Sequence, residues 1–234
     1  MKKLTWFHHL GFYTNPFSIK PAMYDNELLG YGEIIDKVND NIAEGKLSLV
    51  VGPYGTGKTT ILKGVIAKFG GRKAVIYYNC VQKDGDIDYD TLLRKSGGFF
   101  SRLFRIKSKN RILLLDEAQE MSEDDQKSVL DHYGDKFFRA IVLVSKKEDI
   151  SLIKEVKDAI KDSTFELGKL SESEAIELVR RRIGSLDFLP DDIIAKIFRE
   201  NTNPRAFLKN CEEACRIAFE DEAKGVKEKH LKSL

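Results

Sequence analysis

Apolar and polar residues follow two different periods between residues 46 and 170. Short apolar, β-branched runs predict strands, and the longer amphipathic stretches between them predict helices. The runs LSLVV, ILLLD and AIVLV are almost unbroken, which is typical of parallel strands with helices over both sheet faces. The expected strands are Lys46–Val51, Lys73–Asn79, Arg111–Asp116, Arg139–Ser145 and Thr164–Leu167, with helices at 58–69, 89–104, 122–133 and 149–161. The pattern therefore predicts an α/β fold built on a five-stranded parallel sheet.

The pattern changes after Leu170, where only the helical period continues. Three further helices are expected at 171–185, 190–200 and 204–222, with no strand between them. Ser171 begins the first of these helices with a capping box, because Glu174 follows it three residues later. We therefore expect two domains, an α/β core at 1–170 and an all-helical subdomain at 171–234.

Composition narrows the class of protein. The chain has 234 residues, of which 42% are hydrophobic, and a formal net charge of +2. This balance excludes a disordered chain and a polybasic, histone-like protein. Cys80, Cys211 and Cys215 match neither a disulfide framework nor a zinc knuckle, so we expect a reducing, cytoplasmic setting and no metal site made of protein ligands alone. No apolar run approaches the ~20 residues that cross a bilayer, so we expect no membrane insertion.

Residues 52–59, GPYGTGKT, fit the phosphate-binding pattern G-x-x-x-x-G-K-[ST]. They are Gly52, Pro53, Tyr54, Gly55, Thr56, Gly57, Lys58 and Thr59, with Thr60 next in the following helix. Glycines let the backbone curl so that successive N–H groups point at phosphate oxygens, and the helix adds its positive N-terminal end. Lys58 is expected on the β- and γ-phosphates and the Thr59 hydroxyl on Mg²⁺. A fortuitous glycine-rich turn is the alternative, but the apolar strand before the loop and the amphipathic helix after it favour nucleotide binding.

A second motif is the apolar run Ile112–Leu115 followed by the adjacent acids Asp116 and Glu117. At the carboxyl end of a strand, Asp116 would lie beside the phosphate loop and hold Mg²⁺ through water. Glu117 would polarise the attacking water. Alone, two acids after an apolar run indicate no more than the end of a strand. One β-α unit downstream of a phosphate loop, they favour hydrolysis.

These two motifs and the helical C-terminal region resemble the AAA+ ATPases. Within that superfamily the chain is most similar to a group that includes archaeal origin-recognition initiators, secretion ATPases of the ExeA type and transposition helper ATPases. Nearly all of the chain takes part in the resemblance. Its supporting motifs are Asn15-Pro16-Phe17, Tyr78-Asn79-Cys80, Leu167-Gly168-Lys169-Leu170-Ser171 and Asn203-Pro204-Arg205. The resemblance implies a P-loop NTPase fold, ATP and Mg²⁺ as ligands, a helical lid that closes over the nucleotide, and nucleotide-dependent homo-oligomers.

The resemblance also implies roles for residues outside the two motifs. Ser145, at the end of the fourth strand, matches the sensor-1 position and would orient water or the γ-phosphate together with Glu117. Asn15, Pro16 and Phe17 match the segment that wraps the adenine. Taken alone, Ser145 can also be an ordinary end of a strand, and an aromatic N-terminal segment is more often core than ligand contact.

Arg205 matches the sensor-2 arginine at the start of a lid helix. A physical argument supports this role, because Asn203 as N-cap and Pro204 at the first helical position put Arg205 in the first turn. There the helix dipole disfavours a cation by a few tenths of a kcal/mol to about 1 kcal/mol. A nucleotide phosphate would compensate for this cost, and a surface carboxylate would do so too.

The chain departs from the family pattern at the arginine finger. Members commonly carry it between the helix after the fourth strand and the fifth strand, but no arginine occurs between Arg139 and Arg180. The cations expected there are Lys154, Lys157 and Lys161. Lysine lacks the planar fork that clamps a transferring phosphoryl group. We therefore expect slow hydrolysis by the isolated protein, or a partner that supplies the arginine.

Residues 91–115 contain no acidic residue. Their cations are Arg94, Lys95, Arg102, Arg105, Lys107, Lys109 and Arg111, and Phe99, Phe100 and Phe104 lie among them. Clustered cations beside aromatic residues can follow a phosphate backbone, so Arg94–Arg111 is the expected DNA-binding segment. The alternative is a solvated helix face with the phenylalanines in the core.

Together these features favour an ATP-hydrolysing AAA+ enzyme that acts on DNA, in replication initiation or in a helper or loader role that includes mobile elements. Archaeal initiators usually continue into a winged-helix DNA-binding domain, for which residues 171–234 leave no room. This favours the helper or loader role. The alternative is a nucleotide-dependent switch or adaptor with a protein partner and slow intrinsic hydrolysis.

Overall fold

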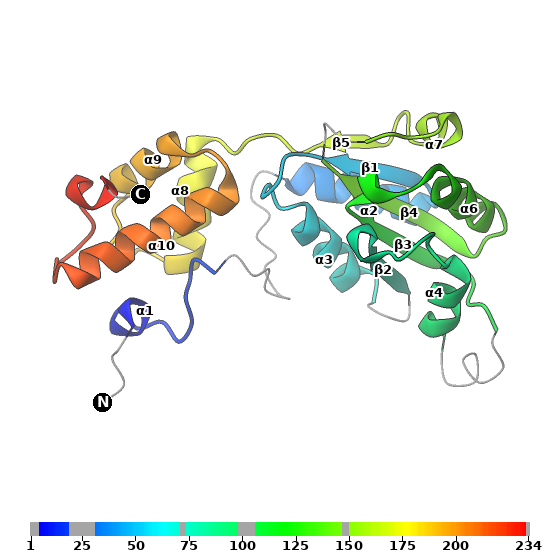
Figure 1. Cartoon of the computed structure of the whole chain (residues 1–234). Coiled ribbons are helices and arrows are strands. Elements are labelled where there is room, and N and C mark those ends of the chain that lie inside the picture. The colour runs from blue at the N-terminus through cyan, green and yellow to red at the C-terminus, as the bar shows by residue number, and fades with distance from the viewer. Residues whose placement is uncertain (1–4, 19–30, 71–73, 98–105, 147–149, 233–234) are drawn as a thin grey trace. The chain divides into compact units, whose positions relative to one another are not determined.

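The computed structural model describes residues 5–18, 31–70, 74–97, 106–146 and 150–232 (Figure 1). The chain divides into two compact units. The first, called here the sheet unit, comprises residues 31–54 and 58–168 and contains every strand. The second, the helical unit, comprises residues 169–234 together with 1–30 and 55–57.

The sheet consists of five parallel strands in the order β2-β3-β4-β1-β5 (Figure 1). The strands are β1 Leu47–Val51, β2 Val75–Asn79, β3 Arg111–Asp116, β4 Phe138–Ser145 and β5 Thr164–Glu166. Every residue of β1 is buried, and so is every residue of β3 after the first. Burial on both faces explains why these strands are almost purely apolar in sequence. The structure confirms the predicted α/β fold with a five-stranded parallel sheet.

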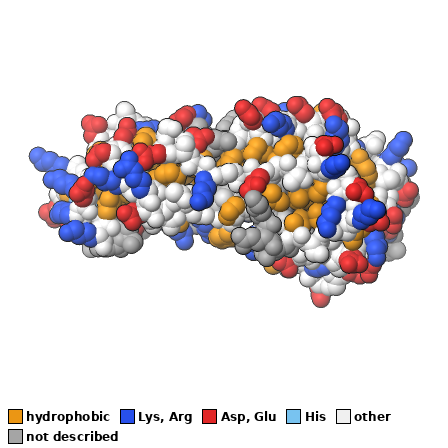
Figure 2. All heavy atoms as spheres, turned by 90° about the horizontal axis from the view of Figure 1, so that it is seen from above, with side chains coloured by type: hydrophobic (Ala, Val, Ile, Leu, Met, Phe, Trp, Pro, Cys, Tyr) orange, Lys and Arg blue, Asp and Glu red, His pale blue; other side chains and the backbone are white. Residues whose placement is uncertain are grey.

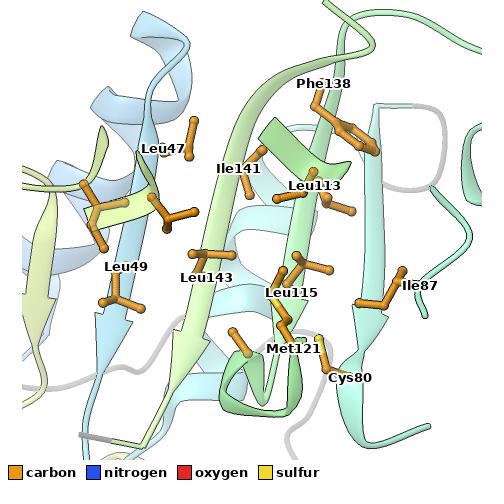
Figure 3. Packing of buried hydrophobic residues seen from close by; sticks show 14 of the residues in the cluster. Leu47, Leu49, Cys80, Ile87, Leu113, Leu115, Met121, Phe138, Ile141 and Leu143 are labelled. Carbon is orange, nitrogen blue, oxygen red and sulfur yellow. The ribbon is translucent and has the colours of Figure 1, made fainter. Parts of the chain in front are cut away.

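Helices cover both faces of this sheet. Those of the sheet unit are α2 Gly32–Glu44, α3 Lys58–Lys68, α4 Tyr89–Ser96, α6 Glu123–Gly134 and α7 Lys154–Ala159, with 3-10 turns η2 Cys80–Gln82 and η3 Ala118–Glu120. On one face, alternate side chains of the strands pack against α4, α6 and α7; Figure 3 shows Leu49, Leu143 and Leu115 side by side in this layer. Side chains alternate along a strand, so Ser48 points to the other face, where Asn41 of α2 donates to its Oγ at 3.0 Å.

The helices differ from prediction at three places. The alternation of strands and helices does not predict α2. The helix expected at 89–104 ends at Ser96, because Gly97 is extended (φ −72°, ψ 163°), and residues 98–105 lie outside the described part of the chain. The helix expected at 149–161 begins only at Lys154.

The helical unit contains α1 Trp6–His9, α8 Glu172–Ile183, α9 Asp191–Glu200, α10 Pro204–Glu220 and the 3-10 turn η4 Glu228–Leu231. The predicted capping box is confirmed, since Ser171 Oγ accepts from Glu174 N and Glu174 Oε2 accepts from Ser171 N at 2.7 Å. Phe198 of α9 and Phe207 of α10 meet edge to face in its core, at 5.3 Å between ring centroids. Among the described helices, none is long and apolar enough to cross a membrane.

Candidate functional site

The carboxyl ends of β1, β4 and β3 lie next to one another at one edge of the sheet. Val51 of β1 stands opposite Ser145 of β4, and the Gly52 N–H donates to the Ser145 carbonyl at 3.2 Å. On its other side β4 pairs with β3, which ends at Asp116. Ser145 therefore lies between the start of the phosphate loop and the acid pair. Open parallel sheets bind their ligands at this edge.

The phosphate loop takes a conformation that requires its glycines. Gly55 and Gly57 have φ angles of +85° and +98°, which L side chains rarely adopt. Directly after the loop, α3 begins at Lys58, and Thr60 lies in its first turn. The helix therefore presents its N-terminal end beside the loop, as an anion site requires.

Lys58 is held across the beginning of this loop. Its Nζ donates to the carbonyls of Gly52 at 2.7 Å and Pro53 at 2.8 Å, and the residue is only 7% exposed. Burial lowers the pKa of Lys58, while the charges of Glu117 and Asp116 act in the opposite direction. The site thus keeps a cation inside the protein with only partial compensation, an arrangement that favours an anionic ligand.

Thr59 and Asp116 are brought together as predicted. The Thr59 hydroxyl donates to Asp116 Oδ2 at 3.1 Å, and Asp116 is 3% exposed. Because the hydroxyl hydrogen is directed at the carboxylate, the lone pairs of Thr59 Oγ1 remain for a cation. Among the described residues no cluster of three His, Cys, Asp or Glu side chains could cage a metal. These two residues therefore fit a Mg²⁺ ion that keeps water and phosphate ligands, which is the usual way proteins hold it.

Tyr77 of β2 also binds Asp116, a contact that the sequence pattern does not predict. Its hydroxyl donates to Asp116 Oδ2 at 3.0 Å, although the residue as a whole is 42% exposed. Burial of the hydroxyl and the charge of Asp116 raise the pKa of Tyr77 to about 12, so the phenol keeps its hydrogen for this bond at neutral pH. Asp116 is thus oriented from two sides, by α3 and by β2.

Glu117 lies at the centre of a polar network that joins it to Ser145. Its backbone is left-handed (φ 54°, ψ 46°), an unusual conformation for a residue other than glycine. Its carboxylate accepts from Gln119 Nε2 at 2.6 Å, and Lys146 Nζ lies 3.9 Å from Glu117 Oε2. Gln119 Oε1 in turn accepts from Ser145 Oγ at 2.8 Å. The residues expected to polarise water and to sense the γ-phosphate are therefore connected through one amide side chain.

Sequence reasoning missed Tyr77, Gln119 and Lys146. A signal exists for two of them, because Gln119 follows the acid pair within the same turn and Lys146 directly follows Ser145.

The start of α10 has the predicted geometry. Asn203 is the N-cap, with its Oδ1 accepting from Arg205 N at 3.1 Å and Ala206 N at 3.2 Å, and Pro204 is the first helical residue. Arg205 therefore lies in the first turn, where the helix dipole disfavours its charge. Its contact with a nucleotide stays a prediction.

The Asn15–Phe17 segment is fixed within the helical unit. Phe17 is fully buried and stacks on Trp6 with ring centroids 5.9 Å apart, and Asn15 Oδ1 accepts from the Phe17 N–H at 2.9 Å. Arg182 of α8 donates to the Pro16 carbonyl at 3.0 Å. The Phe17 ring thus belongs to the core of this unit, and the contact of the segment with adenine stays a prediction.

Part of the basic segment is engaged within the protein. Lys107 Nζ lies 2.6 Å from Asp90 Oδ1, and the ammonium groups of Lys107 and Lys109 lie 5.2 Å and 5.4 Å from the Phe137 ring centre. Cation–π contacts of this kind stabilise the fold by roughly 0.5–1 kcal/mol at exposed sites. The central residues of the segment, including Arg102, Arg105 and the three phenylalanines, lie outside the described residues.

The AAA domain family matches residues 44–176, more than half of the chain. The chain belongs to the AAA domain family. The matched region contains the phosphate loop, Asp116, Glu117 and Ser145, so the sheet order and the geometry above are those of an AAA domain. Family membership implies ATP as the ligand of this edge, typically with Mg²⁺. No curated protein matches the sequence.

Solved structures with the AAA fold resemble this chain at low identity. The Aeropyrum pernix ORC1 protein in complex with DNA matches with a TM-score of 0.70 and 16% identity, over 94% of this chain and 68% of its own. Drosophila ORC bound to DNA matches with a TM-score of 0.64 and 17% identity, over 97% and 63%. RuvB of Thermotoga maritima matches with a TM-score of 0.68 and 15% identity, over 92% and 71%. At such identities the likeness shows the shared fold, and this AAA chain spans about two thirds of these relatives.

Proposed function

We propose that the chain binds Mg²⁺–ATP at the carboxyl edge of the sheet and hydrolyses it. The observation that supports this most directly is the Thr59–Asp116 hydrogen bond beside the Glu117–Gln119–Ser145 network. Lys58 would bind the β- and γ-phosphates, and Thr59 would ligate Mg²⁺, with Asp116 holding its water. Bound Mg²⁺ would neutralise charge that develops on the phosphates.

Glu117 is proposed as the residue that polarises the attacking water. Its carboxylate follows β3 directly and is only partly exposed, so it can act on a water at the same edge as the phosphate loop. General-base residues typically contribute about 10²–10⁴-fold to rate. Steady-state ATPase assays on Glu117→Gln should show this loss, while equilibrium ATP binding is kept.

Glu120→Gln is the matched control, since Glu120 is an exposed acid in the same turn. It should hydrolyse ATP at the wild-type rate. A Glu117→Gln variant that also turned over at the wild-type rate would refute the assignment.

Arg205 is proposed as a sensor-2 residue that compensates its unfavourable place in α10 by binding phosphate. Arg205→Ala should therefore weaken ATP binding and slow turnover, whereas Lys209→Ala, an exposed cation one turn later in the same helix, should change neither. Equal ATP affinity and turnover in Arg205→Ala would remove the assignment. Asn15, Pro16 and Phe17 are proposed to shape the adenine end of the site through backbone contacts, since the Phe17 ring is buried.

The partner proposed for this ATPase is DNA, in a replication-initiation, helper or loader role. The DNA complexes of A. pernix ORC1 and Drosophila ORC support this, as does the acid-free segment Arg94–Arg111. On the face shown in Figure 2, Lys/Arg and Asp/Glu side chains are interspersed. Because the net charge is only +2, a local segment would have to carry DNA binding.

The DNA proposal is tested with the double variant Arg102→Ala/Arg105→Ala. Its affinity for double-stranded DNA should fall, and the slope of log affinity against log salt should become shallower. Lys154→Ala/Lys157→Ala on α7 removes two exposed cations from the same unit and serves as the control. If the first variant binds DNA like wild type, the alternative is favoured, a nucleotide-dependent switch or adaptor for a protein partner.

Nucleotide-dependent assembly of several copies is proposed as well. The resemblance to AAA+ ATPases supports this proposal. The region between Arg139 and Arg180 contains no arginine, so a neighbouring copy would have to supply a cation from another part of the chain. Light scattering with a non-hydrolysable ATP analogue should show a particle larger than the monomer, and a constant monomer mass would contradict assembly.

A further inference from the structure

Gln119 bridges two residues that the proposed function uses and has no assigned role of its own. Its Nε2 donates to Glu117 Oε2 at 2.6 Å, and its Oε1 accepts from Ser145 Oγ at 2.8 Å and from the Lys146 N–H at 3.4 Å. Both ends of one amide are thus used, by groups at the carboxyl ends of two different strands, β3 and β4.

The orientation of this amide is determined by chemistry. The Lys146 N–H can only donate, so it requires the amide oxygen, and a carboxylate can only accept, so Glu117 requires the amide nitrogen. A flipped amide would place oxygen against the Glu117 carboxylate and N–H against N–H. Gln119 therefore cannot exchange its ends without losing both contacts.

The backbone holds Gln119 in a fixed position relative to Glu117. The Glu120 N–H donates to the Glu117 carbonyl at 3.0 Å and the Met121 N–H to the Ala118 carbonyl at 3.1 Å, which closes the turn η3. With the backbone fixed, the side chain of Gln119 decides where the Glu117 carboxylate points. At 3.9 Å, Lys146 adds charge without comparable directionality.

We propose that Gln119 is a positioning residue, which aims the Glu117 carboxylate at the attacking water and couples it to the state of Ser145. The proposal rests on the proposed function of Glu117 as the water-polarising group. If Ser145 Oγ contacts the γ-phosphate, its hydrogen bond to Gln119 Oε1 would change. The shift of the Gln119 amide would then change its hydrogen bond to the Glu117 carboxylate. Gln119 touches neither nucleotide nor water in this role.

Two variants separate positioning from a structural contribution to the turn. Gln119→Leu keeps the bulk and removes all three hydrogen bonds of the amide. Gln119→Glu keeps the shape and the acceptor for Lys146 N, but places a second carboxylate against Glu117. Both should lower kcat by about 10-fold to 100-fold, the effect typical when a hydrogen-bond partner that orients a metal ligand is removed. Both should leave KM for ATP unchanged, because Lys58 and the phosphate loop are intact.

The split between kcat and KM is a readout that a structural role would not move, because a disturbed turn would also affect ATP binding. Glu120→Gln is the control in the same turn, and its kcat and KM should match wild type. A raised KM with an unchanged kcat in the two Gln119 variants would overturn the proposal.

Coupling is measured with a double-mutant cycle. Ser145→Ala and Gln119→Leu should be non-additive, with the double variant no slower than the slower single variant, because both changes interrupt one path. Additive losses would overturn the coupling. If Glu117→Gln stops turnover but both Gln119 variants hydrolyse ATP like wild type, the inference fails and the proposed function stands. If Glu117→Gln turns over like wild type, the proposed function itself fails.

Discussion

Replacement of Lys58 by methionine separates the nucleotide-binding role of this residue from its contribution to the fold. Methionine keeps an unbranched apolar stem in the buried position and removes the ammonium group. Two hydrogen bonds from a charged donor stabilise by ~1.5–3 kcal/mol each, and burial of the charge costs several kcal/mol. The lowered pKa of Lys58 shows that burial disfavours its charge. The two effects oppose each other, so the free energy of unfolding without ligand should fall by much less than the roughly 3–6 kcal/mol of the two hydrogen bonds.

With nucleotide the two proteins should differ clearly. At a ligand concentration of about 100 times Kd, binding stabilises the wild-type protein by about 2.7 kcal/mol, since the folded state alone binds. For a chain of this length that corresponds to a rise in Tm of about 8 °C. Lys58→Met should show no rise, because the β- and γ-phosphates lose their cation.

Thermal unfolding with and without Mg²⁺–ATP is the assay. Lys68→Met, an exposed cation at the other end of α3, is the control and should keep the full rise. An equal rise in Lys58→Met would refute the placement of the phosphates. If ligand-free Lys58→Met lost several kcal/mol of stability, the cost of burying the Lys58 charge would not offset its two hydrogen bonds, and the argument from its lowered pKa would be refuted.

Three further predictions concern single side chains. The buried carboxylate of Asp125 accepts from Ile87 N at 2.6 Å and from Lys83 Nζ at 2.8 Å. Asp125→Ala should therefore lower the free energy of unfolding by about 3 kcal/mol, measured by urea unfolding. Burial lowers the pKa of His230 in the folded protein below its ordinary value of 6.5, so the unfolded chain binds the proton more readily. The free energy of unfolding should therefore fall as pH drops below 6.5. His230→Gln should flatten this pH dependence in urea unfolding, and an unchanged slope would contradict the assignment. Tyr77→Phe removes the hydroxyl that donates to Asp116 Oδ2. The Mg²⁺ concentration for half-maximal ATPase activity should then rise by up to about 10-fold. An unchanged concentration would contradict the orienting role of Tyr77.

The strands were predictable because burial on both faces leaves a simple record in sequence. Strands that are buried after their first residue, such as Arg111–Asp116, must be apolar almost throughout, and charged residues mark their ends. The phosphate loop was equally visible, since the positive φ angles of Gly55 and Gly57 admit little else than glycine. Burial of a strand and the φ angles of a tight loop restrict residues that are consecutive in the sequence. Such restrictions can be recognised before the fold is known.

Tertiary contacts explain what the pattern could not show. The helix expected from residue 149 begins at Lys154 because Gln126 binds the preceding segment, donating to the Ser151 carbonyl and accepting from the Ile153 N–H, both at 2.9 Å. The contact between Tyr77 and Asp116 joins residues 39 positions apart, and no periodicity links them. The contact of Gln119 with Ser145 was hidden for the same reason, because Ser145 is the last residue of another strand.

The charges at the sheet edge bear on how hydrolysis is driven. Lys58 and Lys146 face Asp116 and Glu117 there, and both acids and Lys146 influence the pKa of Lys58. Two cations and two acids leave this edge close to neutral before a ligand binds. Because Mg²⁺–ATP is a net anion and its γ-phosphoryl group carries charge through the transition state, the bound site requires a further cation.

Lys146 is poorly suited to supply it. Its Nζ already lies 3.9 Å from Glu117 Oε2, and lysine cannot clamp a transferring phosphoryl group from two sides as arginine can. Arg205 is one proposed source, and a cation from a neighbouring copy is the other. If the neighbour supplies it, the ATPase rate per chain should rise with protein concentration and level off once assembly is complete. A rate per chain that is independent of concentration, and that Arg205→Ala abolishes, would instead mean that a single copy provides every charge the reaction requires.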